Sequence, residues 1–209
     1  MENINDQKPT EKKPMSKILK IVGGIIVFLF VVNILVGITR ESGNSSVDTQ
    51  EWATITTPDG RLTMSLPRNP TYEYTNASSE KVEGYSYIAE EYDGHVTYVV
   101  KYENWQSIAD REGIEIKTLD DETIRSLLKA NVDLEIAEFD VSNFVSEFIS
   151  SHGYRAIRFD GQIKEGNSTA TIQGISMFVE GHLYTFVALA DSGYSTDLER
   201  LLNSVSFNF

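Results

Sequence analysis

Ser126 and Lys129 form an S-x-x-K pattern, the arrangement in this sequence that is nearest to a known catalytic motif. In penicillin-binding enzymes, the lysine one helical turn after the serine activates the serine hydroxyl as a nucleophile. The S-D-N and K-T-G segments that complete such a site do not occur in this sequence, and Ser195 lacks the second glycine of a nucleophile elbow. The pattern therefore predicts a solvated helix face at Ser126 and a helix N-cap at Ser195 or Thr196. No catalytic constellation is found, and no enzyme activity is expected.

The histidines and the acidic residues do not have the spacing of metal ligands. His95, His152 and His182 each adjoin a glycine and fit turns, and no two of them have the spacing of zinc ligands. The acidic run at residues 120–122 lacks the alternating loop of an EF-hand and is typical of a first helical turn, where carboxylates meet the positive end of the helix dipole. We therefore predict no metal site and no cofactor.

An aromatic hairpin supplies the candidate binding residues. Asp93-Gly94 suits a two-residue type I′ turn, which places Tyr85 opposite Tyr102 and puts Tyr98 on the same face. Two interpretations are open for this face: packing in the core or at its rim, or an aromatic surface that lines a ligand site. If it is a binding surface, the candidate ligand or partner contacts are Tyr85, Tyr98, Tyr102 and Trp105.

The remaining pattern predicts more strands and two helices. Strands around a turn at residues 180–182 are apolar on both faces, so the sheet needs cover on both sides, and helices are the expected cover. Residues 67–84 contain many polar residues and are predicted to be mostly loop. The other predicted elements are strands at 52–56, 61–67, 144–163 and 168–178, helices at 120–131 and 195–205, and a short extended end at 206–209.

An apolar run near the N-terminus predicts a membrane anchor. Ile21 to Ile38 are 18 consecutive uncharged residues, about 27 Å as a helix, which nearly spans a hydrocarbon core of about 30 Å. A cleaved secretory signal is the alternative, but its apolar core is only about 7 to 15 residues long, and no small-residue cleavage site follows here. Five lysines precede the run and only Arg40 follows it closely, so the N-terminus is expected in the cytoplasm of a single-pass protein of the cell membrane. The expected parts are a cytoplasmic tail (1–17), a transmembrane helix (18–40), a flexible linker (41–50) and an extracytoplasmic domain (51–209).

Charge excludes one class of partner. Residues 41–209 contain 12 Lys and Arg against 28 Asp and Glu, a net charge of −16. Such a surface repels phosphate backbones, so we expect no nucleic acid partner. The chain has no cysteine, so an exported domain of this size depends on packing alone for its stability.

The order of elements resembles a known family. Over residues 52–209, the sequence resembles the PsbP-like fold family. The resemblance rests on GRLTMSLP, the paired YSYIAEEYDGHVTYVVKY, a mid-chain helix, SHGYRAIRFDG, the strands around EGHLYTF and the closing LERLLNSVSF. That family includes a photosystem II extrinsic protein, a Ran-binding nuclear-import factor and bacterial envelope lipoproteins of the DcrB type. The resemblance implies an α+β fold, an antiparallel sheet flanked by helices in an α/β/α sandwich, here preceded by one transmembrane helix. It implies no active site, because the family has no common catalytic motif.

Three classes of function remain open on the sequence alone, and an enzyme of unrecognised type is the one with the least support, because no catalytic constellation is found. The first is a membrane-anchored extracytoplasmic interaction module that binds an envelope protein partner through its sheet edge or loops. The alternative is a small-molecule or peptide receptor that uses the aromatic hairpin. A pocket lined by Tyr85, Tyr98 and Tyr102 would favour the receptor, and an exposed patch would favour the module.

Overall fold

The computed structural model describes residues 51–76, 82–137, 139–165 and 168–209. The tail, transmembrane helix and linker expected at 1–17, 18–40 and 41–50 lie outside these residues. Within the described ranges, no helix is long and apolar enough to cross a membrane. The structure therefore concerns the part of the chain that the sequence assigns to the extracytoplasmic domain.

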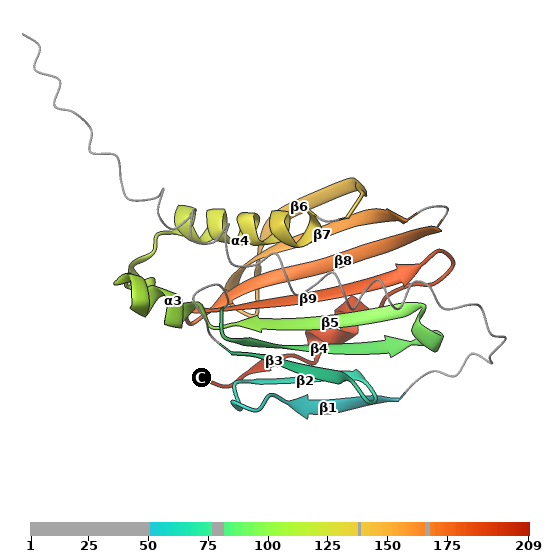
Figure 1. Cartoon of the computed structure of the whole chain (residues 1–209), viewed down its shortest axis with the longest axis horizontal. Coiled ribbons are helices and arrows are strands. Elements are labelled where there is room, and N and C mark those ends of the chain that lie inside the picture. Colours follow the sequence, from blue (N-terminus) through green and yellow to red (C-terminus); the bar gives the residue numbers. More distant parts are fainter. Residues whose placement is uncertain (1–50, 77–81, 138, 166–167) are drawn as a thin grey trace, which may run out of the picture.

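Seven strands form the main sheet, and every neighbouring pair in it is antiparallel (Figure 1). This agrees with the predicted antiparallel sheet. In spatial order the strands are β3 (Thr71–Thr75), β4 (Gly84–Glu91), β5 (Val96–Glu103), β9 (His182–Asp191), β8 (Ser168–Val179), β7 (Tyr154–Glu165) and β6 (Val141–Ser151).

One face of the main sheet is covered by two helices, of which only the second was predicted. These are α3 (Trp105–Glu112) and α4 (Asp121–Ile136). Ile124, Leu127 and Leu128 of α4 are buried, so the predicted apolar stripe of this helix does pack on the sheet. The side chain of Asp120 accepts a hydrogen bond from the backbone N–H of Thr123, which confirms that the acidic run caps this helix.

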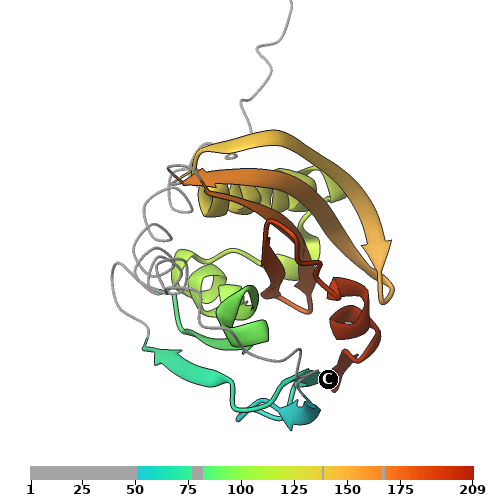
Figure 2. The same cartoon turned by 90° about the vertical axis from the view of Figure 1, so that its right-hand side faces the viewer.

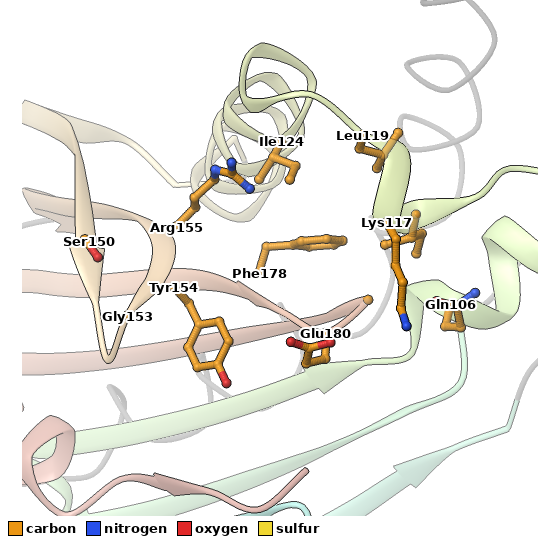
Figure 3. A pocket seen from close by; sticks show the side chains of 12 residues that line it. Gln106, Lys117, Leu119, Ile124, Ser150, Gly153, Tyr154, Arg155, Phe178 and Glu180 are labelled. Carbon is orange, nitrogen blue, oxygen red and sulfur yellow. The ribbon is translucent and has the colours of Figure 1, made fainter.

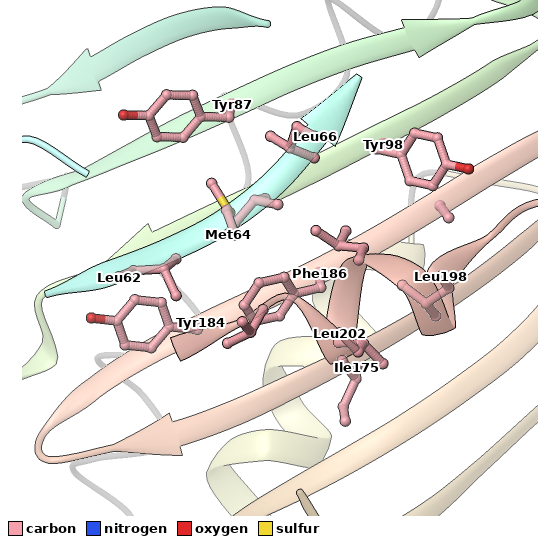
Figure 4. Close-up of a cluster of buried hydrophobic side chains, with 14 of the residues drawn as sticks. Leu62, Met64, Leu66, Tyr87, Tyr98, Ile175, Tyr184, Phe186, Leu198 and Leu202 are labelled. Atoms are coloured by element: carbon pink, nitrogen blue, oxygen red, sulfur yellow. The ribbon is translucent and has the colours of Figure 1, made fainter. Parts of the chain in front are cut away.

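The other face differs from a simple α/β/α sandwich. It is covered by the six-residue helix α5 (Leu198–Asn203) together with a second, three-stranded sheet of β1 (Trp52–Thr56), β2 (Leu62–Pro67) and β10 (Ser206–Phe207), in the order β1-β2-β10. Leu62, Met64 and Leu66 alternate along β2 and have no exposed surface. Figure 4 shows them over the main sheet, beside Tyr184, Phe186 and α5. Figure 2 shows β1 and β2 of this small sheet (cyan) at the far side of the molecule from α4.

The hairpin registers agree with the sequence patterns. Tyr85 lies opposite Tyr102 as predicted. The turn itself is different, because a 3-10 segment, η1 (Tyr92–Gly94), replaces the expected two-residue turn. Four residues now separate Glu91 from Val96, and an even number of turn residues keeps the same side chains on the same face. The β8–β9 turn is Glu180-Gly181, with φ of 47° and 85°, the backbone signs of a type I′ turn.

Two elements were missed. Strand β3 lies where a loop was predicted, because Tyr72 and Tyr74 alternate with smaller polar residues and pair with β4 at the edge of the sheet. Helix α3 was not predicted at all. The side chain of Asn104 accepts a hydrogen bond from the N–H of Ser107 at its start, and Gly113 ends it with a φ of 67°.

Candidate functional site

The four predicted aromatic contacts are core residues. Tyr85, Tyr98 and Tyr102 are 5%, 0% and 6% exposed and lie on the face under β2 and α5, whereas Trp105 is 6% exposed and lies on the opposite face. The hydroxyl of Tyr98 donates to Glu91 and accepts from the backbone N–H of Asp197, which holds the start of α5. Of the two interpretations left open above, packing is the one that the structure shows for these side chains.

The catalytic patterns are also explained by local structure. The ammonium group of Lys129 is bonded to the carboxylate of Asp133 on the exposed side of α4, so a solvated helix face describes the S-x-x-K pattern. The N-cap predicted at Ser195 or Thr196 is wrong by one or two residues: Asp197 caps α5, and its side chain accepts from the N–H of Arg200. Within the part of the chain that the structure describes, no group of three His, Asp or Glu side chains is arranged to hold a metal ion.

His182 sits in a buried polar contact between the two sheets. It is 6% exposed, and its Nε2 accepts a hydrogen bond from Arg61 Nη1 at 2.6 Å. With Nε2 as acceptor, Nδ1 carries the hydrogen of the neutral ring and donates it to the Tyr102 hydroxyl at 3.1 Å. Burial, and then the nearby guanidinium of Arg61, lower the pKa of His182 from 6.5 to about 4.

This contact predicts a pH dependence of stability. The unfolded chain takes up a proton on His182 below about pH 6.5, whereas the folded chain resists it until about pH 4. The contribution of neutral His182 to the free energy of unfolding is therefore largest above pH 6.5. It falls by about 2 to 3 kcal/mol as the pH drops to 4. Urea titrations of the wild type and of His182→Gln at several pH values measure this, because the glutamine variant keeps hydrogen-bonding groups but does not titrate. Equal losses in both proteins between pH 6.5 and 4 would contradict the assignment.

A cleft opens at one end of the main sheet, between the strand turns and the helices. It has a volume of about 660 Å³, within the range of about 300 to 1,000 Å³ that is usual for ligand sites. Figure 3 shows Phe178 in its middle, with Lys117 on the helical side and Glu180 and Tyr154 on the side of the strand turns. Its lining comes from α3, η2 (Ile116–Thr118), the start of α4 and the β6–β7 and β8–β9 turns: Gln106, Ile116, Lys117, Leu119, Ile124, Ser150, Gly153, Tyr154, Arg155, Phe178, Glu180 and Gly181.

The charged side chains of this cleft differ in whether they are bonded to other residues. Arg155 and Arg125 both bond to the carboxylate of Asp121, and these two arginines lower the pKa of Asp121. Arg155 is therefore already engaged. Lys117 and Glu180 are exposed, and no salt bridge or side-chain hydrogen bond joins either of them to another residue among those that the structure describes.

After the cleft, strand β6 is the second candidate binding feature on the surface. It ends the main sheet and pairs on one side only, with β7, so among the described residues its outer backbone edge is open. Seven of its eleven residues are exposed, including Val145 at 62% and Phe148 at 40%. A bulge between Ser142 and Val145 interrupts the pairing, and from Val145 to Ser151 the ladder is regular. An open edge of this length is a template for another strand.

A buried charged cluster lies under α4. Lys101 on β5 contacts Glu103 at 3.0 Å and Glu135 of α4 at 2.6 Å, and Trp105 Nε1 donates to Glu103 at 3.1 Å. Burial by itself lowers the pKa of Lys101, but the two carboxylates outweigh it and hold the pKa above its ordinary value. The cluster therefore joins β5 to α4 as an ion pair network, and none of Lys101, Glu103 and Glu135 lines the cleft.

The candidate residues that sequence analysis missed are those of the cleft and of β6. Lys117 and Glu180 are far apart in the chain, and no spacing rule connects them. The apolar exposure of β6 had a weak signal, because Phe144, Val145, Phe148 and Ile149 place apolar residues on both faces of one strand. An edge strand with one open flank is a natural position for such a pattern.

No protein-family model and no curated protein matches this chain. Among solved structures, it is similar to the cyanobacterial PsbP (CyanoP) from Synechocystis sp. PCC 6803, with 10% identity, a TM-score of 0.48, and coverage of 80% of this chain and 98% of that one. It is also similar to LpqN, described as involved in cell envelope biogenesis of Mycobacterium tuberculosis, with 12% identity, a TM-score of 0.36, and coverage of 75% and 88%. A PsbP protein is thus among the structural neighbours. Both scores are below 0.5, so we base no site and no function on these likenesses.

Proposed function

We propose that this chain is a membrane-anchored bacterial member of the PsbP-like fold family, and that its extracytoplasmic domain binds an extended segment of an envelope protein by strand addition at β6. The observation that carries the binding part of the proposal is the open outer edge of β6 with exposed Val145 and Phe148. The anchor and the location are supported by the apolar run at 21–38 and by the lysines that precede it.

The chemistry of the expected partner follows from the edge. A strand added beside residues 145–151 would gain backbone hydrogen bonds. Its side chains on one face would lie next to Val145 and those on the other face next to Phe148, because these two residues are three apart in a regular strand. Glu147 is exposed between these two residues, and residues 41–209 carry a net charge of −16. The partner segment is therefore expected to be extended, rich in β-branched or aromatic residues, and neutral or basic.

The alternative receptor function loses its predicted site. Tyr85, Tyr98 and Tyr102 are buried among β2, α5 and the main sheet, so a ligand at the surface does not reach them. A receptor function would have to use the cleft instead.

Charge placed on β6 should abolish capture of the partner. Val145→Lys puts an ammonium group on an open edge, which disfavours pairing with another strand, while its exposed position limits the loss of stability to about 0.5 kcal/mol. The matched control is Tyr74→Lys on β3, the opposite edge of the same sheet, where Tyr74 is 50% exposed. After crosslinking in intact cells, purification of the full-length tagged chain and mass spectrometry, we expect one envelope protein to be recovered with the wild type and the control and to fall at least tenfold with Val145→Lys.

The opposite pattern would refute strand addition at this edge. If recovery were unchanged by Val145→Lys and lost with Tyr74→Lys, the binding edge would be β3.

Protease protection tests the proposed orientation of the chain across the membrane. Protease added to intact cells, after removal of any wall that blocks it, should digest the domain and leave a short N-terminal fragment with its epitope protected, because the lysine-rich end stays in the cytoplasm. Detergent should expose that epitope as the control. A mature protein that begins near residue 41 would show cleavage instead of anchoring.

A further inference from the structure

The cleft has an apolar floor held in a fixed position. Phe178 is 8% exposed, and the ring of Trp105 packs edge-on against it, with the ring centres 6.3 Å apart. Ile116 and Ile124 are also buried beside it. A large apolar group that enters the cleft would therefore meet an ordered apolar surface and would displace water from it.

Two side chains of opposite charge line the cleft beside this apolar floor. Lys117 comes from η2 and Glu180 from the β8–β9 turn, and both line the cleft. In Figure 3, Lys117 lies to one side of the Phe178 ring and Glu180 lies below it. Since neither is engaged by another described residue, a ligand with one anionic and one cationic group can bind both without breaking an existing ion pair.

The position of Glu180 is itself unusual for its residue type. Its φ is 47°, and the first residue of a type I′ turn is most often Asn, Asp or Gly. A glutamate in this left-handed conformation works against the local preference, so the turn does not explain why the residue is there. The neighbouring Gly181 fits closely, because a Cβ atom at that position would lie 2.7 Å from Oε1 of Gln106. The turn therefore packs against the side chains of Gln106 in α3 and Ile116 in η2.

From these contacts we infer that the cleft binds a small zwitterion with a large apolar side chain, such as free phenylalanine or leucine. The ligand carboxylate pairs with Lys117, the ligand ammonium group pairs with Glu180, and the side chain packs on Phe178. This site differs from the edge proposed for strand addition, because Lys117, Phe178 and Glu180 all lie outside β6, although Ser150 of β6 also lines the cleft.

Calorimetric titration of the purified full-length chain in detergent tests the site with four probes. Phenylalanine carries all three features, phenylalaninamide lacks the carboxylate, 3-phenylpropionate lacks the ammonium group, and glycine lacks the apolar side chain. We expect saturable binding of phenylalanine and at least tenfold weaker binding of each of the other three, because each loses a charge-assisted contact or the apolar contact.

Variants test whether the ligand carboxylate pairs with Lys117 and the ligand ammonium group with Glu180. In Lys117→Met, phenylalanine should bind no better than phenylalaninamide, and in Glu180→Gln it should bind no better than 3-phenylpropionate. Lys129→Met, which removes a lysine on the exposed face of α4, should bind all four probes like the wild type. The inference is overturned if phenylalanine shows no saturable binding, or if Lys117→Met still prefers phenylalanine to its amide by the wild-type factor.

Discussion

A chain that ends at Val205 should unfold about 10 °C below the full-length protein. The deletion removes β10, which pairs with β2 through Ser206 and Phe207. It also removes the Phe207 ring, which lies 5.1 Å from that of Tyr184 and 5.6 Å from that of Tyr154, measured between ring centres. Phe207 is half-buried rather than fully buried, so we expect a loss of about 3 to 4 kcal/mol, a large part of a typical stability of about 5 to 15 kcal/mol.

A shorter deletion separates the strand from the terminal residue. Phe209 is 56% exposed, so a chain that ends at Asn208 keeps β10 and should melt within about 4 °C of the parent. Thermal unfolding followed by circular dichroism measures both variants. If the chain that ends at Val205 kept the parent melting temperature, the C-terminus would be a tail and not part of the second core layer.

Lys101→Met should destabilise the domain by about 3 to 5 kcal/mol, because it leaves two buried carboxylates without the ammonium group that contacts both. The side chains of Glu103 and Glu135 are only 9% and 6% exposed, so water can replace little of that contact. Urea unfolding at pH 7 measures the loss.

The control for this variant restores charge balance without restoring the ion pairs. Lys101→Met combined with Glu103→Gln and Glu135→Gln replaces the charged cluster by neutral groups of similar size, and it should recover most of the lost stability. If the single variant were as stable as the wild type, the cluster would not contribute to the joint between β5 and α4.

Hairpin pairing was predictable because the side-chain period of a strand is two. The Asp93-Gly94 signal placed the correct residues opposite one another, although the first turn was longer than expected. The turn signal at 180–182 left two registers open, but both place the correct residues on the same face of the sheet. The apolar stripes of α4 and α5 could also be predicted from the sequence, because the helical period of 3.6 places their apolar residues on one face.

Helix α3 shows where this reasoning falls short. Only Trp105, Ile108 and Ala109 give it an apolar side, too few for a clear period in eight residues. Its caps, Asn104 and Gly113, were the better signal, because capping preferences act over a few residues and do not need a long repeat.

The candidate sites depend on tertiary neighbours and were hidden for that reason. The sequence left both core packing and a ligand-lining surface open for Tyr85, Tyr98 and Tyr102, because the pattern of a hairpin does not show what covers it. The cover is β2, an early strand held in place by the last two residues of the regular structure, Ser206 and Phe207. In the same way, Lys117 and Glu180 line one cleft only because η2 lies beside the β8–β9 turn.

The most direct test of partner binding at β6 is photocrosslinking from the strand itself. A photoreactive phenylalanine analogue at position 148 of the full-length chain in intact cells should give one discrete adduct, and the crosslinked peptide of the partner should be an extended, neutral or basic segment. Adding Val145→Lys should remove that adduct, and the same analogue at position 74 on β3 should not give it. No adduct from position 148, or the same adduct from both edges, would contradict strand addition at β6.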